Sequence, residues 1–354
     1  MKMYIRATGI ISPQRTFGHP AFLAETVEYK EDRLYCAEPD YKEIIDVKWM
    51  RRMSRIIKMG VAAALECLQE AKLEMPDAII TGTAYGCMED TGIFLNKMVE
   101  NKEEMLTPTA FIQSTHNTVG AQIALILSCN KYNNTFVHRG FSFESALMDA
   151  ILLLKENEAN NILVGSADEI TDFSHAILSR FGLYKKHLSS NLDLYKDNSK
   201  GTIAGEGASF FVLSNQPSGT DYAILEATTT FYKPENAVAI KKQVHSFLAS
   251  QSLNLEEIDL LINGRNGDID DDKIYEELNS IMFSDTTQIS YKHLCGEYPT
   301  SSSFALWVAV NIVKRGALPL AAGNVTGLKK KIKRILIYNH YQTAYHSLFL
   351  IAAC

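Results

Sequence analysis

An internal repeat restricts the fold of this chain more than any other feature of its sequence. Residues 76–82 and 258–264 each contain an acidic residue, an apolar stretch and a closing glycine. Further along each half, residues 133–155 are echoed by 288–296 with the helix after them, and Ile162–Val164 by Ile335–Ile337. Three strand elements in the same order predict two similar halves that pack together. Strands alternating with helices predict parallel or mixed sheets covered by helices.

We therefore predict an α/β chain that forms one compact unit, with a first half at residues 1–215 and a second at 216–354. The segment 214–220, which contains Pro217 and Gly219, is a turn-rich linker. Residues 170–200 are polar with scattered aromatic side chains, and we expect them to form a lid-like excursion of the first half. Helices are expected over 51–73, 114–127 and 271–282, where apolar residues recur at helical spacing.

The central stretch, residues 133–169, predicts a strand, a sharp turn, a long helix and a second strand. Gly140 permits a tight turn, Ser142 can cap the helix, and Glu144 suits the positive end of its dipole. A strand, a turn and a helix in this order commonly present a nucleophile at the helix N-terminus. The nucleophile position holds Gly140. Ser142 gives a partial match to a hydrolase turn, although helix capping also explains a serine there.

Composition excludes several classes of function. The chain has 354 residues, a net charge of −6 and 46% apolar residues, which describe a globular protein without affinity for nucleic acid. No apolar run is long enough to span a membrane and no leader is evident, so a cytoplasmic location is expected. The six cysteines and nine histidines are scattered without metal-ligand spacing, so neither a metal nor a cofactor is expected.

Several short motifs together resemble the β-ketoacyl synthases. They are Arg51–Arg55 before an alanine-rich helix, Ile79–Thr83, Val164–Glu169, Gly205–Ala208, and Lys292 with Gly296. These motifs lie in the family's order and cover nearly the whole chain. The resemblance implies a thiolase-like duplicated fold, with two similar halves whose mixed sheets are layered by helices, α-β-α-β-α. The internal repeat agrees with that fold independently.

The same resemblance implies that the chemistry of the family has been lost. Members use a cysteine at the turn and two histidines for decarboxylative condensation of acyl thioesters. Here the cysteine falls on Gly140, the first histidine on Gly264 and the second on Glu297, whereas Lys292 and Glu169 are retained. The glycine-rich loop near the C-terminus falls on residues 339–345, which contain no glycine. A carboxylate at 297 would oppose a developing oxyanion.

Inactive homologues of this kind resemble chain length factors, which pair with an active β-ketoacyl synthase in fatty-acid or polyketide-type biosynthesis. Family dimers form through the strand before the turn, here about residues 134–138. The resemblance therefore implies an interface or acyl-tunnel set of Phe136, His138, Arg139, Phe141 and Phe143. A basic cluster could contact an acyl carrier protein or simply be solvated; it consists of Lys329, Lys330, Lys331, Lys333 and Arg334.

Two other interpretations stay open at this stage. The chain could be a condensing or thioester-processing enzyme with a relocated nucleophile, Cys87 or Cys295, although a buried thiol explains either residue. It could also be a homodimeric acyl-binding scaffold that keeps only the fold. An intact-mass search for a covalent acyl adduct distinguishes the first alternative, and a stable self-dimer indifferent to any synthase marks the second.

Overall fold

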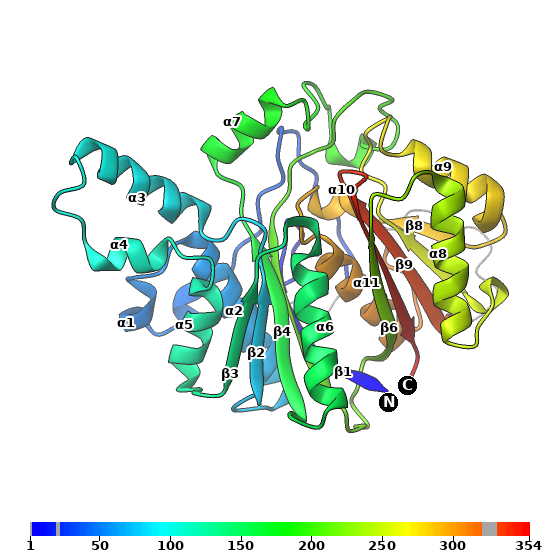
Figure 1. The fold of residues 1–354 in the computed structure, drawn as a ribbon, viewed down its shortest axis with the longest axis horizontal. Coiled ribbons are helices and arrows are strands. Elements are labelled where there is room, and N and C mark those ends of the chain that lie inside the picture. Colours follow the sequence, from blue (N-terminus) through cyan, green and yellow to red (C-terminus); the bar gives the residue numbers. More distant parts are fainter. Residues whose placement is uncertain (1, 19–21, 321–330) are drawn as a thin grey trace.

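The computed structural model describes residues 2–18, 22–320 and 331–354, and it contains one mixed sheet of ten strands in the order β3-β2-β4-β5-β1-β6-β10-β9-β7-β8 (Figure 1). The strands are β1 (Met3–Ile11), β2 (Ala78–Gly82), β3 (Tyr132–Phe136), β4 (Asn161–Asp168), β5 (Gly207–Ser214), β6 (Ala223–Tyr232), β7 (Leu260–Asn263), β8 (Gln288–Ser290), β9 (Arg334–Tyr341) and β10 (Tyr345–Ala352).

The two halves of the sheet have the same topology. The first half has the order β3-β2-β4-β5-β1, and the second repeats it as β8-β7-β9-β10-β6. In each half the first three strands are parallel, and the next two pair antiparallel to their neighbours. The halves join where Met3–Ile5 of β1 pair with Ala223–Leu225 of β6. The predicted thiolase-like duplication is confirmed, and residue 215 lies in the connection between β5 and β6.

The two halves of the sheet alternate with three sets of helices, which gives the expected five layers (Figure 1). The outer face of the first half packs against α2 (Arg55–Ala71) and α5 (Thr118–Leu127). The outer face of the second half packs against α8 (Ala237–Ser250) and α9 (Lys273–Leu278). Between the halves lie α6 (Ser142–Lys155) and α11 (Ser302–Arg315), the helices that follow equivalent strands of the repeat.

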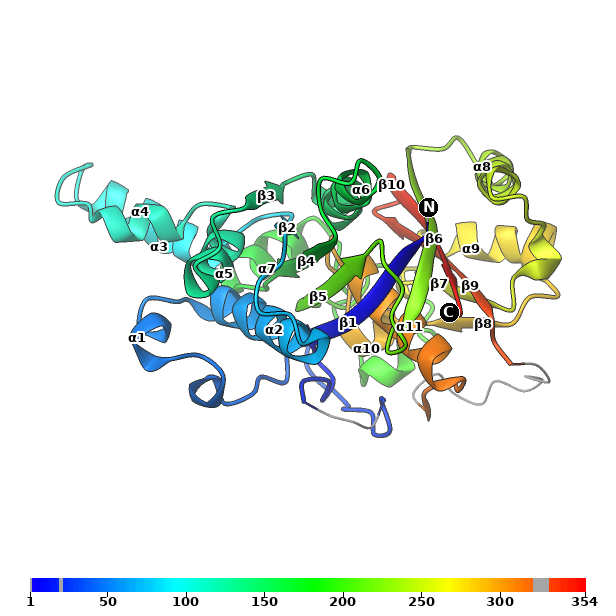
Figure 2. The same ribbon diagram turned by 90° about the horizontal axis from the view of Figure 1, so that it is seen from below.

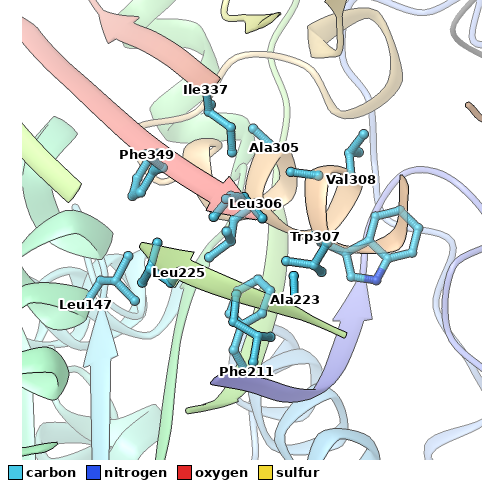
Figure 3. Packing of buried hydrophobic residues seen from close by; sticks show 14 of the residues in the cluster. Leu147, Phe211, Ala223, Leu225, Ala305, Leu306, Trp307, Val308, Ile337 and Phe349 are labelled. Atoms are coloured by element: carbon cyan, nitrogen blue, oxygen red, sulfur yellow. The ribbon is translucent and has the colours of Figure 1, made fainter. Parts of the chain in front are cut away.

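The largest apolar cluster surrounds these two central helices (Figure 3). Leu147 of α6 and Leu306 of α11 lie in it with Phe211, Leu225 and Phe349 from the sheet. All five side chains are essentially inaccessible to water. Burial of large apolar side chains, each contributing about 1.5–3 kcal/mol, is the main force that holds the halves together.

Three predicted helices differ from the structure at their ends. The helix expected over 51–73 begins at Arg55, because Ser54 is its N-cap and the preceding residues form the short α1 (Val47–Met50) and a turn. The helix expected from residue 114 begins at Thr118. The helix expected over 271–282 is α9 followed by a π-helical turn, Asn279–Phe283. Local periodicity does not distinguish these irregular turns from continuous helix.

The lid-like segment contains a regular helix. Within residues 170–200, α7 (Asp172–Arg180) begins with a capping box in which Thr171 and Ser174 satisfy each other's backbone donors. A second protrusion is formed by α3 (Met88–Glu100) and α4 (Pro108–Gln113), which extend together away from the rest of the molecule (Figures 1 and 2). None of the described helices is long and apolar enough to cross a bilayer.

Candidate functional site

The predicted turn lies where β3 leads into α6, and its backbone is locked by its own serine. The chain passes through a short 3-10 turn, Arg139–Phe141, with Arg139 at φ +49. The Ser142 hydroxyl donates to the Arg139 carbonyl (2.8 Å) and accepts from the His138 N–H (2.8 Å). Ser142 is fully buried. Both bonds hold the turn, so this serine is a structural residue rather than an exposed nucleophile.

Two tyrosines fill the space that a side chain at position 140 would need. A β-carbon added to Gly140 would lie 2.8 Å from Tyr345 Cβ and 2.9 Å from Tyr341 Cβ. Both tyrosines belong to the β9–β10 hairpin, at the place where the family's glycine-rich loop was expected. The Phe141 ring then packs edge-on against Tyr345, with centroids 5.0 Å apart. No larger residue fits at 140 unless this hairpin moves.

The second degenerate position, Gly264, is enclosed in the same way. A β-carbon there would clash with Asn339 Oδ1 and would lie 2.8 Å from the Tyr275 hydroxyl. Asn339 Oδ1 accepts a hydrogen bond from Tyr291 (2.8 Å), which fixes the amide in place. The space beside Gly264, where the resemblance implies the family's first histidine, is therefore occupied by the Asn339 side chain of β9.

The third position, Glu297, forms a buried ion pair with the retained lysine. Glu297 Oε2 lies 2.6 Å from Lys292 Nζ and also accepts from Asn266 Nδ2 (3.1 Å). Lys292 Nζ donates in addition to the His340 carbonyl (3.2 Å). Burial raises the pKa of Glu297, and the adjacent lysine only partly offsets this effect. A carboxylate held by a lysine cannot act as the neutral donor that a histidine supplies.

A cavity of about 380 Å³ remains in front of these residues. Its walls include Glu169, Glu297 and Tyr341, and α7 with residues 182–184 covers one side. The retained Glu169 accepts from the Glu89 N–H (3.0 Å), and burial raises its pKa to about 8. Gly140 is not among the lining residues, whereas Tyr341, whose Cβ lies close to Gly140, is one of them.

The two candidate relocated nucleophiles are poorly suited to attack. Cys87 and Cys295 are both fully buried. Burial raises the pKa of the Cys87 thiol, with further contributions from the nearby Asp90 and Glu169 carboxylates. Burial likewise raises the pKa of Cys295 well above its usual range, and its Sγ donates to the Gly296 carbonyl. A nucleophilic cysteine needs a lowered pKa and access, and neither thiol has them.

The residues expected at an interface occupy three different environments. β3 is an edge strand of the sheet, and after it Val137, His138 and Arg139 are exposed. Arg139 takes part in none of the ion pairs found in residues 2–18, 22–320 and 331–354. Phe136 is half-buried and Phe141 is 7% exposed.

Phe143 lies elsewhere, because its ring is fully buried against Phe211 and Phe349 in the central cluster. We therefore leave Phe143 out of the interface.

The structure describes only part of the basic cluster predicted from the sequence. Lys329 and Lys330 lie outside the described residues. Lys331 and Lys333 are exposed, whereas Arg334 pairs with Glu226 at 2.9 Å at the start of β9.

The sequence analysis missed two features, one beside Gly140 and one on α3 and α4. One is the packing of Tyr341 and Tyr345 against Gly140. The absence of glycine from residues 339–345 was the sequence feature that could have predicted it. The other is a set of exposed apolar side chains on α3, α4 and the loop between them; they are Ile93, Leu95, Val99, Met105, Phe111 and Ile112. Their exposed fractions reach 80% at Val99 and 91% at Met105. Because large apolar side chains gathered on one protrusion mark a contact surface, this arm is a candidate interface.

Known proteins similar to this chain are β-ketoacyl synthases. Residues 35–181 match the family model for the β-ketoacyl synthase N-terminal domain. The chain is a relative of the β-ketoacyl synthases. It is 21% identical over 186 residues to 3-oxoacyl-[acyl-carrier-protein] synthase 2 of Staphylococcus aureus (strain N315), a match that spans 49% of this chain and 44% of that protein.

Solved structures of this family share the fold over the full length of the chain. The ishigamide ketosynthase/chain length factor superposes with a TM-score of 0.80 at 16% identity, covering 100% of this chain and 99% of the other. The structure of a ketosynthase (ApeO) in complex with its chain length factor (ApeC) from Xenorhabdus doucetiae gives 0.71 at 13% identity, covering 100% and 98%. At these identities the likeness concerns the fold alone.

Proposed function

We propose that this chain is a non-catalytic, chain-length-factor-like partner of an active ketosynthase in fatty-acid or polyketide-type biosynthesis. The observation that carries the proposal is the enclosure of Gly140 by the β-carbons of Tyr341 and Tyr345. A condensing enzyme must hold an acyl group on a nucleophile at this position. Here neither the nucleophile nor the space for its acyl group is present.

The other two catalytic positions support the same proposal. The Asn339 side chain fills the space beside Gly264, and Glu297 forms an ion pair with Lys292. Replacing a larger residue by glycine at 264 alone would leave a void, whereas here the Asn339 side chain occupies the space. These contacts support a fold that is kept for a partner surface rather than for chemistry.

Two exposed features provide that surface. The β3 edge offers unpaired backbone groups, which can hydrogen-bond to a strand of another chain. The arm formed by α3 and α4 projects on the same side of the molecule and carries the exposed apolar set (Figure 2). The resemblance implies that family dimers form through the strand equivalent to β3. We therefore place an active ketosynthase against β3 and the arm.

The decisive experiment is co-expression with a cysteine-bearing ketosynthase encoded nearby, followed by size exclusion and native mass spectrometry. We expect a one-to-one complex, and chain extension on a carrier-bound substrate that neither subunit performs alone. The matched control is the same complex with the ketosynthase cysteine changed to alanine, which should be inactive because this chain supplies no nucleophile.

A stable self-dimer that ignores the ketosynthase would overturn the proposal in favour of a homodimeric scaffold. Activity that survives the alanine control would instead point to a nucleophile in this chain. Intact-mass analysis after incubation with an acyl thioester would then show the adduct, and peptide mapping would test Cys87 and Cys295.

A further inference from the structure

The open edge of β3 is formed by alternate residues, because successive residues of a strand direct their backbone groups to opposite edges. The Phe136 carbonyl accepts from the Thr83 N–H (3.1 Å), so the backbone groups of Phe136 and Asn134 face β2. The N–H and carbonyl groups of Asn133 and Thr135 therefore point to the open edge. A strand of another chain that extends this sheet would pair with these two residues.

One donor of this edge is already used by the side chain that precedes it. The Thr135 N–H donates to Asn134 Oδ1 at 2.9 Å. Asn134 Nδ2 donates to the Tyr132 hydroxyl (3.2 Å), which in turn donates to Asp149 Oδ2 on α6 (3.0 Å). The reverse orientation of the Asn134 amide would place two donors face to face at Thr135. The Asn134 side chain therefore covers the Thr135 donor and is anchored to the helix beside the strand.

This cover is the restraint that the edge of β3 carries. An open edge strand can pair with any similar strand, and proteins restrain such edges with charges, prolines, bulges or covering groups. Residues 132–136 contain neither a charged residue nor a proline. Their register with β2 is continuous, without a bulge. The Asn134 side chain is thus the feature that limits access to this edge.

We propose that Asn134 makes β3 selective for a strand of a different chain, because it closes the Thr135 donor against a second copy of this chain. A symmetric pair of β3 strands uses the same donor on both copies, so two Asn134 side chains must be released. A partner strand without an equivalent side chain requires only one release. The inference rests on the proposed function for the identity of that partner, an active ketosynthase.

Amide hydrogen exchange of the isolated full-length chain, followed by NMR, tests the cover directly. The Thr135 N–H should exchange at least about fivefold faster in Asn134→Ala than in the parent, because it loses its acceptor. The Phe136 N–H faces β2 and is the internal reference, which should not change. Tyr132→Phe leaves Asn134 in place but removes its anchor, so it should give a smaller increase at Thr135.

The selectivity is tested by two dissociation constants, that of the self-dimer and that of the ketosynthase complex, both measured by analytical ultracentrifugation. One hydrogen bond changes an equilibrium about fivefold. Asn134→Ala should therefore lower the constant of the self-dimer about twenty-five-fold and that of the ketosynthase complex only about fivefold. The matched control is Asn133→Ala, which should alter neither constant, because the Asn133 side chain donates to the Gly120 carbonyl of α5 (3.0 Å).

Equal exchange of Thr135 in the parent and in Asn134→Ala would overturn the proposal, and so would equal self-association of the two. A weaker ketosynthase complex in Asn134→Ala would also overturn it, because Asn134 would then bind the partner instead of closing the edge. Equal acceleration at Phe136 would mean that β3 unfolds in this variant, and exchange at Thr135 in Tyr132→Phe then decides.

The failure of this inference is distinguishable from the failure of the proposed function. If the parent chain forms no complex with a ketosynthase, the proposed function fails. The exchange and self-association measurements use the isolated chain, so they still decide whether Asn134 closes the edge of β3.

Discussion

Replacing Gly140 by alanine tests directly whether the β9–β10 hairpin encloses this turn. The added β-carbon would lie 2.8 Å from Tyr345 Cβ and 2.9 Å from Tyr341 Cβ, whereas carbon atoms prefer about 3.5–4.0 Å. Both opposing atoms are β-carbons attached to the backbone, so no rotamer change can relieve the overlap. Gly140 has no positive φ, so the cost comes from contact alone.

The expected loss of stability follows from these distances. Overpacking a core costs roughly 1–3 kcal/mol, and two rigid contacts place this site near the upper end. The gain from restricting the unfolded chain offsets about 0.4–1 kcal/mol, so we expect a net loss of about 2 kcal/mol. The measurement is urea unfolding with a constant m-value, which separates stability from changes of compactness.

The matched control is Gly92→Ala in α3. A β-carbon at Gly92 meets nothing within 4 Å, so alanine there should be neutral or should stabilise the helix by up to about 1 kcal/mol. If Gly140→Ala unfolds at the same urea concentration as the parent, the hairpin can yield, and position 140 could accommodate a nucleophile. That result would refute the reasoning behind the proposed loss of catalysis.

Three further predictions concern the interior and the arm. Glu144 is fully buried and burial raises its pKa to about 7, so its contribution to stability is largest below about pH 4.5 and falls as the pH rises towards 7. Glu144→Gln should match the parent at pH 4.5 and exceed it by about 3 kcal/mol at pH 8; equal stability of the two at both pH values would contradict the raised pKa. Lys292→Met should cost about 3–5 kcal/mol because it leaves Glu297 buried without its partner, and adding Glu297→Gln should recover part of that loss in a double-mutant cycle. Changing Phe111 and Ile112 of the arm to serine should weaken the ketosynthase complex at least about tenfold, because their exposed fractions are 58% each. The control for that pair is Phe173→Ser on α7, also exposed, which should leave the complex intact.

The sequence predicted the duplicated fold because its signals are local and repeated. The strands at 78–82 and 260–263 are short apolar runs that end at or before a glycine, and the same order of elements occurs twice, so pairing and layering follow from general rules. The position of Gly140 was likewise predictable, since a strand, a turn and a helix surround it. Phe143 could have been placed correctly, because it shares one helical face with Leu147 and Ala150, which face the core.

The side chains that fill the space beside Gly140 and Gly264 could not be predicted in the same way. Tyr341 and Tyr345 reach Gly140 from a hairpin about two hundred residues further along the chain, and Asn339 reaches Gly264 from the same strand. Such contacts depend on side-chain direction at the ends of strands, which periodicity does not specify. The ion pair of Lys292 with Glu297 is a partial exception, because both residues were singled out, but only the structure joins them.

Gly140, Gly264 and Glu297 are coupled through one structural element, so under the proposed function a return to catalysis would require several changes at once. The strand β9 and its hairpin supply Asn339 against Gly264, the His340 carbonyl to Lys292, and Tyr341 with Tyr345 against Gly140. Restoring a cysteine at 140 would therefore require removing two tyrosines, and restoring a histidine at 264 would require removing Asn339, which holds Tyr291. Each step alone creates a clash or a cavity. Selection on such a chain would act on β3 and the arm, whose residues lie outside this hairpin.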